Sequence, residues 1–420
     1  MRDFILLRGI QGSGKSTFIE ENDMLIPYTI SSDSVRLLFQ SPEIDPFDNH
    51  FKISQNNERK VWSFIKERIS ERMQRGELII LDAMNIDVSK WIDMAKYYSY
   101  NLHVLNFDVP LEECIERNKN RESYKYVPED IIRSCYERIT NCNVPKDVHV
   151  FKNKQEFISL FINGYDSFMD INDKEKVIFF GDIHGCFNPL EKYFAENPFS
   201  SKNYYVFCGD YLDRGIQNKE TLEFLMFLST YDNVCFIEGN HNWESFYAND
   251  QMDRIKSNEF LNNTLSQIKS IDKNRIKNFI SKWKLYAELD FNGKQFFVSH
   301  AGFGKYPIRK KLISAKSFLK GDKYSDDVDK WWEEHNRWDV IQIHGHRNQY
   351  NYPMEQFEHS INMCEYVEYG DCLRVVEFDK DGNRKFLRYK NDVYRTNVNP
   401  WKLDKEKEEI IIERLSVFSV

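Results

Sequence analysis

The stretch CGDYLDRG at residues 208–215 decides the fold of the second half of the chain, together with GDIHG at 181–185 and GNHN at 239–242. Each motif directly follows an apolar run of the kind that forms a buried strand. Loops at strand ends are where layered sheets place binding and catalytic residues. The pattern therefore predicts a layered α/β domain whose polar site is assembled from several strand ends. The runs are Val177–Phe180, Tyr204–Cys208, Val234–Glu238, Phe296–Ser299 and Val340–Ile343.

The first half of the chain has a different pattern, which begins with RGIQGSGKST at residues 8–17. The apolar run Phe4–Leu7 stops at this glycine loop, as a parallel strand buried on both faces does. We expect a helix to begin near Lys15. Further apolar and helical patterns alternate after it and predict a βαβ domain with a parallel sheet. They are the strands Leu78–Leu81 and Leu102–Phe107 and the helix Val61–Met73.

The length of the chain, 420 residues, exceeds what one hydrophobic core usually serves. The polar segment FMDINDKEK at 168–176 lacks strong periodicity, so we place a domain boundary near residue 172. The predicted parts are a first domain at 1–171, a second domain at 172–400 and a docked helix at 401–420.

The net charge and the spacing of the cysteines exclude several classes of protein. A formal net charge of -8 disfavours a long groove that neutralises many phosphates, although contact with one strand end stays open. Eight cysteines without a CxxC pair argue against a disulfide framework and a zinc knuckle. The N-terminal apolar stretch is too short for a signal peptide, and no segment approaches the ~20 apolar residues that span a bilayer. We expect no membrane partner and a cytoplasmic location, in a host cell if the chain is viral.

The opening loop fits the pattern G-x-x-x-x-G-K-[ST], in which backbone N–H groups surround phosphate oxygens. Lys15 would reach the terminal phosphates, and Ser16 would ligate Mg²⁺. The alternative, a glycine turn with only a structural role, is disfavoured because the motif follows a buried strand and opens a helix. The residues assigned to ATP here are Gly9, Gly12, Ser13, Gly14, Lys15, Ser16 and Thr17.

Two further polar pairs in the first half could act on the γ-phosphate. Asp33 precedes Arg36 by three residues, so on a helical turn Asp33 could accept a hydroxyl proton while Arg36 holds a phosphate. The alternative for Asp33 is a helix cap. Arg117 and Arg121, four residues apart, could close over the transferring phosphate from one helical face. Their alternative is a solvated charged face.

Assembled, GIQGSGKST, SDSVR and the paired arginines ahead of Val127 and Pro128 resemble the kinase domain of the polynucleotide kinase–phosphatase (Pnkp) family. The resemblance implies a P-loop fold and transfer of an ATP γ-phosphate to the 5′-hydroxyl of a nucleic acid. It implies that Asp33 is the general base.

The polar residues at the strand ends of the second half resemble, in their order, the ligands of the binuclear metallophosphoesterases. The resemblance implies an α/β sandwich flanked by helices, with one ion on Asp182, His184 and Asp210. Asp210 would bridge to a second ion on Asn240, His300 and His346. Mixed carboxylate and imidazole ligands suit Mn²⁺, Fe, Ni²⁺ or Zn²⁺ better than Ca²⁺. Two such ions can activate a water and clamp a phosphate; the alternative is a fold that has lost its metals.

Neighbouring residues take supporting roles in this interpretation. His241 can protonate the leaving oxygen if Asp213 orients it, and Arg214 can grip phosphate. His344 is favoured as a supporting or structural histidine over a direct ligand. One departure is Asn242: the family usually has GNHE, and an asparagine at this position keeps hydrogen-bonding capacity but carries no charge.

The basic stretch Lys305–Lys323 follows His300 directly. It could guide a nucleic-acid strand, with Tyr306 or Phe318 stacking on a base, or it could be a solvated face.

A kinase and a phosphatase on one chain make sense if they act on different ends of a broken strand. We therefore predict an RNA or DNA end-healing enzyme that uses ATP, Mg²⁺ and Mn²⁺, with a separate RNA ligase as partner and homo-oligomerisation left open. The first alternative is a serine/threonine protein or diadenosine tetraphosphate phosphatase with an appended P-loop kinase or nucleotide-sensing domain. The second is a scaffold without activity.

Overall fold

The computed structural model describes residues 2–44, 51–121, 123–164, 168–321, 327–347 and 353–395. The chain divides into two compact units, one formed by Met1–Asp166 with Ile308–Lys316 and the other by Ser167–Pro307 with Ser317–Val420. The helix expected at 401–420 lies outside the described residues. Among the residues described, no helix combines the length and the apolar character needed to cross a bilayer.

The first unit is a parallel sheet covered by helices on both faces, as predicted. The strand order is β2-β5-β1-β6-β7, and every neighbouring pair is parallel. The strands are β1 (Asp3–Arg8), β2 (Thr29–Ser31), β5 (Ile79–Asp82), β6 (Asn101–Asn106) and β7 (His149–Val150). A short hairpin is added by β3 (Glu43–Ile44) and β4 (Phe51–Lys52). The helices are α1 (Lys15–Glu21), α2 (Ser32–Phe39), α3 (Glu58–Gln74), α4 (Ile92–Tyr97), α5 (Leu111–Lys119), α6 (Glu129–Thr140) and α7 (Lys154–Ile158).

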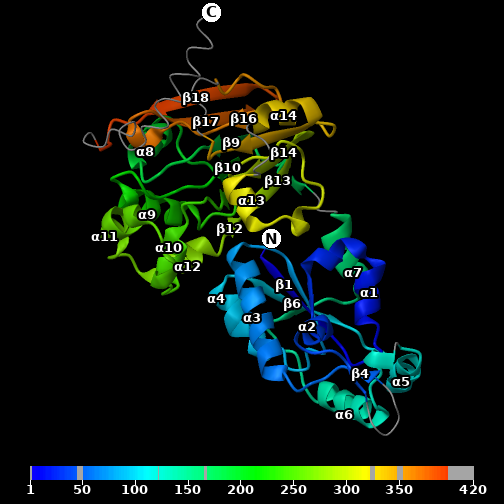
Figure 1. Ribbon diagram of the computed structural model, residues 1–420. Coiled ribbons are helices and arrows are strands. Elements are labelled where there is room, and N and C mark those ends of the chain that lie inside the picture. The colour runs from blue at the N-terminus through cyan, green and yellow to red at the C-terminus, as the bar shows by residue number, and fades with distance from the viewer. Residues whose placement is uncertain are drawn as a thin grey trace, which may run out of the picture. The chain divides into compact units, whose positions relative to one another are not determined.

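The alternating direction of the side chains along β1, the central strand, explains why helices cover both faces of the sheet. Phe4 and Leu6 pack in one core with α3 and α4, whereas Ile5 and Leu7 pack in another with α1 and α7. Successive side chains of a strand point to opposite faces, so a continuous apolar run needs cover on both sides. Figure 1 shows α3 and α4 on one side of this sheet and α1 and α7 on the other.

The second unit is built from two sheets. One has the order β12-β11-β10-β9-β17-β18 and the other β16-β15-β14-β13-β8. The strands are β8 (Met169–Asp170), β9 (Lys176–Phe180), β10 (Asn203–Phe207), β11 (Val234–Ile237), β12 (Trp283–Lys284), β13 (Tyr286–Phe291), β14 (Lys294–Ser299), β15 (Val340–His344), β16 (Ser360–Asn362), β17 (Cys372–Asp379) and β18 (Arg384–Lys390). The helices include α8 (Phe187–Glu196), α9 (Asn218–Leu228), α10 (Trp243–Ala248), α12 (Lys273–Ile280), α13 (Ala315–Lys320) and α14 (Val328–His335).

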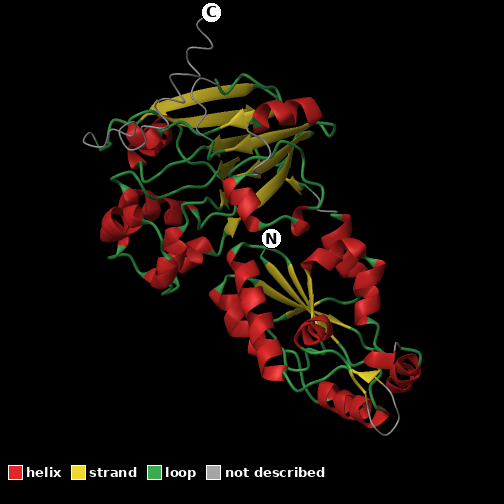
Figure 2. Cartoon of the chain, in the orientation of Figure 1, coloured by secondary structure: helices red, strands yellow, loops and turns green. Residues whose placement is uncertain are grey.

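The core of the second unit lies between the two sheets and beneath the helices. Val177 and Phe179 of β9 pack with Phe296 and Ile343 of the facing sheet. The alternate residues of β9 pack beneath α8, α9 and α12. Figure 2 shows the strands of this unit gathered in layers with helices outside them. The predicted helix-flanked sandwich is confirmed, and its strand ends carry the polar motifs.

Candidate active sites

The glycine loop of the first unit forms a compact cradle between β1 and α1. Lys15 Nζ donates to the carbonyl oxygens of Gly9 and Ile10, each at 2.9 Å. Gly12 has φ 77°, and a Cβ there would lie 2.3 Å from the carbonyl oxygen of Cys114. Only glycine fits a left-handed position with so little space. The loop is therefore fixed in shape, with Lys15 folded back over it.

Asp82, which no motif in the sequence indicates, completes this cradle. Ser16 Oγ donates to Asp82 Oδ2 at 2.8 Å, and Asp82 is the last residue of β5. Burial lowers the pKa of Lys15 and raises the pKa of Asp82, while each group's charge opposes the shift of the other. A hydroxyl and a carboxylate side by side suit Mg²⁺, which prefers oxygen ligands.

The Asp33 and Arg36 pair lies on the first turns of α2, as expected. Arg36 Nη1 is 2.7 Å from Asp33 Oδ1. The helix cap is Ser31, whose side chain accepts from the backbone of Ser34, so Asp33 is not needed as a cap. The other edge of the Arg36 guanidinium is bound by Glu58, with Nε 2.6 Å from Oε1. Arg36 is thus held between two carboxylates, and Asp33 keeps a partly exposed carboxylate.

The prediction that Arg117 and Arg121 share one helical face is wrong. Helix α5 ends at Lys119, and Arg121 lies in the turn that follows. The side chain of Asn118 bonds both the N–H and the carbonyl of Val127, which folds the chain back and ends the helix. Arg117 still approaches the glycine loop, because its Nη1 lies 3.6 Å from the place of a Cβ on Gly14. The charge of Arg121 acts on Lys15.

Two triads of candidate metal ligands lie at the strand ends of the second unit. Each residue of a triad offers one ligand atom, and these atoms lie within 4.8 Å of one another. Because Asp210 belongs to both triads, it is placed to bridge two ions. The triads are Asp182, His184 and Asp210, and Asp210, His300 and His346.

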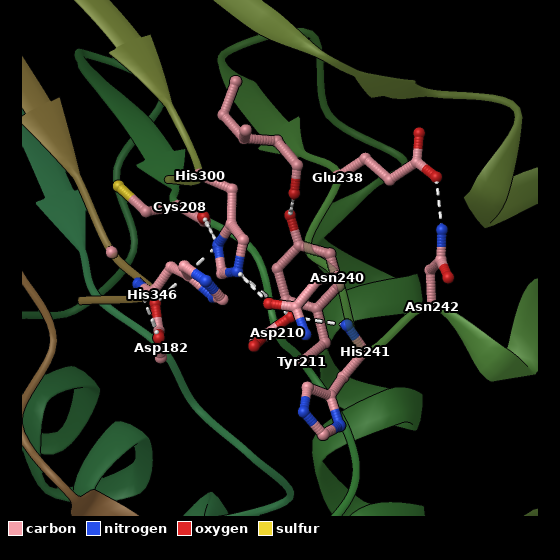
Figure 3. Close-up of polar contacts among 12 residues, drawn as sticks. Asp182, Cys208, Asp210, Tyr211, Glu238, Asn240, His241, Asn242, His300 and His346 are labelled. Atoms are coloured by element: carbon pink, nitrogen blue, oxygen red, sulfur yellow. Dashed lines mark hydrogen bonds and ion pairs between the residues drawn. The ribbon is translucent and has the colours of Figure 1, made fainter. Parts of the chain in front are cut away.

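Backbone contacts determine which nitrogen of each histidine faces this centre. Nδ1 of His300 lies 2.8 Å from the Cys208 carbonyl oxygen, and Nδ1 of His184 lies 3.3 Å from that of Leu212. Each Nδ1 therefore carries a proton and donates it, which leaves Nε2 as the coordinating atom. Nε2 of His300 lies 3.1 Å from Asn240 Oδ1, the remaining predicted ligand (Figure 3).

The hydrogen-bond partners of the two Asp182 oxygens show whether the residues present fit a metal. Asp182 Oδ2 accepts from the backbone N–H of His346 at 2.9 Å and from the thiol of Cys364 at 3.0 Å. Its Oδ1 is buried and has no hydrogen-bond partner in the described part of the chain. A buried carboxylate oxygen without a partner is costly, and a cation would satisfy it. The donor set therefore fits two divalent cations.

Burial and mutual charge shift the pKa values of the ligands in different directions. Burial raises the pKa of Asp182 to about 6. Burial by itself would lower the pKa of His300, but the charges of Asp210 and Asp182 raise it to about 9. Burial, assisted by the charge of His300, lowers the pKa of His346 to about 3. Protons and cations compete for such ligands, since metal binding requires their deprotonated forms.

The turns that carry these ligands are unusual in backbone conformation. Residues of the centre with left-handed φ, between 48° and 75°, are His184, Asp210, Asp213, Arg214 and His346. Non-glycine residues in this region are strained, and such strain is concentrated at functional sites. Close packing adds to it, because a Cβ on Gly345 would lie 1.9 Å from Asp182 Oδ1. The fold thus holds the ligands in a constrained geometry.

A second set of residues surrounds the ligands. His241 Nδ1 lies 2.9 Å from Asp213 Oδ2, and Thr264 Oγ1 donates to Asp213 Oδ1 at 2.6 Å. Arg214 Nη2 lies 3.0 Å from His241 Nε2, and its Nη1 lies 2.7 Å from Glu368 Oε1. Asp213 can thus orient His241, and Glu368 orients Arg214 toward the centre.

The departure at Asn242 has a local explanation. Asn242 Nδ2 donates to Glu238 Oε1 at 2.6 Å, so the amide is paired with a carboxylate four residues earlier. Figure 3 shows this pair at the base of the loop that carries Asn240 and His241. A negative charge is therefore present beside the loop, at Glu238 rather than at Asn242.

Two residues from the sequence analysis have packing roles. His344 is fully buried, and its Nε2 lies 2.9 Å from Asp329 Oδ1 in α14, which makes it a structural histidine. The prediction that Phe318 stacks on a base is wrong, because Phe318 is 0% exposed and stacks on Tyr286 in the core. Tyr306 is partly buried, and its hydroxyl donates to Glu288.

Fold and site together define a metal-dependent phosphoesterase joined to a P-loop unit. The chain belongs to the calcineurin-like phosphoesterase family, whose model matches residues 175–391, and an AAA domain model matches residues 4–141. This order of domains matches the Pnkp-like architecture.

Individual relatives match the second unit. The chain is 24% identical over 227 residues to the asymmetrical bis(5′-nucleosyl)-tetraphosphatase PrpE of Oceanobacillus iheyensis, covering 48% of this chain and 88% of that protein. It is 30% identical over 191 residues to PrpE of Anoxybacillus flavithermus, covering 40% of this chain and 76% of that protein. A crystal structure of a putative diadenosine tetraphosphatase has TM-score 0.38 and 18% identity, covering 54% of this chain and 99% of that chain.

Proposed function

We propose that the chain is a nucleic-acid end-healing enzyme that acts on RNA. In this proposal the first unit transfers the γ-phosphate of ATP to a 5′-hydroxyl end. The second unit removes a 3′-phosphate or opens and removes a 2′,3′-cyclic phosphate. A separate RNA ligase would then join the healed ends.

The observation that carries the proposal is the presence of two candidate sites with opposed chemistry on one chain. Lys15, Ser16 and Asp82 are arranged so that they could bind a phosphate and Mg²⁺, and the two ligand triads could hold the cations of a phosphoesterase centre. On a single substrate group these activities would cancel. On the two ends of a broken RNA strand they are both required, because a ligase needs a 5′-phosphate and a free 3′-hydroxyl.

In the kinase reaction, the oxygen of the 5′-hydroxyl attacks the γ-phosphorus of ATP, its proton passes to a base, and ADP leaves. Asp33 is suited to take this proton, since its carboxylate is 44% exposed and contacts only one edge of Arg36. Glu58 holds the other edge and fixes the orientation of Arg36. Lys15 and the arginines near the loop would stabilise charge on the transferring phosphate.

In the phosphatase reaction, a water attacks phosphorus and the leaving oxygen takes up a proton. His241 Nε2 is the atom suited to supply this proton, because Nδ1 is engaged by Asp213. Arg214 would turn from His241 to the phosphate while Glu368 retains it. When bound, the two cations supply Lewis-acid chemistry by activating water and neutralising phosphate charge. Mn²⁺ or another divalent transition metal would fit the mixed carboxylate and imidazole ligands.

A second candidate is hydrolysis of dinucleoside tetraphosphates. The relatives named bis(5′-nucleosyl)-tetraphosphatase support it for the second unit. The P-loop unit would then be an appended kinase or nucleotide-sensing domain.

The test is to incubate the protein with ATP, Mg²⁺, Mn²⁺ and an equimolar mixture of two substrates. These are diadenosine tetraphosphate and a short RNA with a 5′-hydroxyl and a 2′,3′-cyclic phosphate. End healing predicts a 5′-phosphate and a free 3′ end on the RNA. Turnover of the dinucleotide with both RNA ends unchanged would favour the second candidate.

A further inference from the structure

The chain that follows the last strand returns to the metallophosphoesterase centre. Asn391, which follows β18, is fully buried. Its side-chain Nδ2 donates to the carbonyl oxygen of Val367 at 2.8 Å, and its backbone N–H donates to the carbonyl oxygen of Asp371 at 2.9 Å. Tyr394 packs against Gly370, where a Cβ would lie 2.5 Å from the ring. The segment is therefore fixed against the turn Val367–Tyr369, which also carries the carboxylate that holds Arg214.

This course places Arg395 beside the turn 213–215. Arg395 Nη1 lies 3.0 Å from Glu259 Oε1, and its Nη2 donates to the carbonyl oxygen of Gly215 at 3.5 Å. Its side chain is 23% exposed. Arg395 and Arg214 are each ion-paired with one carboxylate, Glu259 and Glu368 respectively.

Tyr369 directly follows Glu368, the carboxylate that holds Arg214, and interacts electrostatically with both guanidinium groups. Its hydroxyl is within electrostatic reach of Arg214 and Arg395 and of their carboxylate partners. Among the residues that the structure describes, no hydrogen bond engages this hydroxyl. Two oriented guanidinium groups and a phenol hydroxyl that can donate a hydrogen bond are together suited to bind phosphate oxygens.

The position of these donor groups relative to the candidate metal ligands and to the proposed acid decides which phosphate of a substrate they would bind. Arg214 contacts both His184, a candidate ligand, and His241, the proposed acid. Asp213, which orients His241, belongs to the same turn that Arg395 contacts. Arg395 and Tyr369 therefore stand on the side where the leaving group departs.

We propose that Arg395 and Tyr369 form a subsite for a second phosphate group on the leaving-group side of the substrate. The inference rests on the phosphoesterase role of the centre. Two kinds of substrate share this chemistry: an RNA end, whose next phosphodiester lies one nucleotide away, and a dinucleoside polyphosphate. A simple phosphoester such as p-nitrophenyl phosphate has only the phosphate that is cleaved.

The experiment compares Arg395→Gln and Tyr369→Phe with wild type in the full-length, Mn²⁺-loaded protein. Substrates are an RNA with a 2′,3′-cyclic phosphate, diadenosine tetraphosphate and p-nitrophenyl phosphate. Arg388→Gln is the matched control, because Arg388 is an exposed arginine of β18 that is also paired with a carboxylate. Thermal unfolding checks that each variant folds.

The quantity compared is the ratio of two KM values, that for the two-phosphate substrate which wild type uses and that for p-nitrophenyl phosphate. This ratio should rise about tenfold in Arg395→Gln. It should rise about threefold in Tyr369→Phe, as expected for the loss of one neutral hydrogen bond. Arg395→Lys should restore part of the loss, and Arg388→Gln should change nothing. An unchanged ratio in a folded Arg395→Gln variant would overturn the subsite.

The arms of the experiment separate the subsite from the proposed function. If wild type cleaves only diadenosine tetraphosphate and the ratio shifts, the subsite stands and end healing is wrong. If wild type cleaves RNA and the ratio does not shift, end healing stands and the subsite is wrong. If wild type hydrolyses p-nitrophenyl phosphate alone, both fail.

Discussion

Replacing Asn242 by glutamate tests whether the loop that carries Asn240 and His241 depends on the contact with Glu238. In the native protein the amide donates to the Glu238 carboxylate at 2.6 Å. Asn242→Glu removes this donor and places a second negative charge beside the first. Because Glu238 is 7% exposed, its charge has little solvent to screen it.

The magnitude follows from the geometry. Two unit charges about 4 Å apart repel by roughly 4 kcal/mol at an effective dielectric constant of 20. Protonating the introduced carboxylate at pH 7 instead costs a similar amount, about 3.7 kcal/mol from a reference pKa of about 4.3. Asn242 is partly exposed, so screening and rotation toward water reduce the loss to about 2 kcal/mol. For a unit of this size that is roughly 4–8 °C in Tm.

The assay is thermal unfolding with phosphatase kinetics for Asn242→Glu, and for the same change combined with Glu238→Gln. The double variant exchanges amide and carboxylate, so it should recover at least half of the lost stability and activity. Asn249→Glu adds a charge at the exposed end of α10 and serves as control. If Asn242→Glu matches wild type in Tm and kcat, or if Glu238→Gln gives no recovery, the contact does not support the loop.

Three further changes give equally direct tests. Asp213→Asn should lower kcat for RNA phosphates by roughly 10²–10⁴-fold but affect p-nitrophenyl phosphate far less, because p-nitrophenolate leaves without a proton; equal losses on both would exclude His241 as the acid. Asp82→Asn should cut kinase turnover by roughly a hundredfold and leave phosphatase turnover intact, because the amide can still accept from Ser16 but lacks the negative charge that would help hold Mg²⁺ and that acts on Lys15; a parallel fall in phosphatase turnover would contradict this. Burial raises the pKa of Glu244 well above its usual range, so the folded state binds this proton more tightly and wild-type stability falls as pH rises above about 4.5. Glu244→Gln should therefore gain stability relative to wild type as pH rises above about 4.5, by up to about 1.4 kcal/mol per pH unit, measured by urea unfolding; a difference that does not change as pH rises above this value would argue against the buried carboxyl.

Local signals in the sequence determined most of the fold. The runs Phe4–Leu7 and Val177–Phe180 predict strands because a continuous apolar stretch requires cover on both faces, and both are strands of central position. The start of α1 at Lys15 followed from the glycine loop. The candidate metal ligands were indicated by the order of their motifs, which resembles that of the binuclear metallophosphoesterases, and each motif follows a strand.

Contacts distant in the sequence could not be predicted in the same way. Glu58 holds Arg36 across 22 residues and Glu368 holds Arg214 across 154 residues, with no motif spacing to indicate either. The basic stretch suggested a surface, yet Phe318 is buried because α13 turns it into the core beside Tyr286. The end of α5 depends on the side chain of Asn118, a tertiary contact that overrides helical spacing.

The measurement that tests the central claim most directly uses one RNA with a 5′-hydroxyl and a 2′,3′-cyclic phosphate. Wild type, Lys15→Ala and Asp182→Ala are each incubated with labelled ATP, Mg²⁺ and Mn²⁺, and both ends of the product are resolved. Two independent sites on one repair substrate predict that Lys15→Ala loses only 5′ labelling and Asp182→Ala loses only 3′ healing. If wild type leaves both RNA ends unchanged while it hydrolyses another phosphoester, the end-healing account is contradicted.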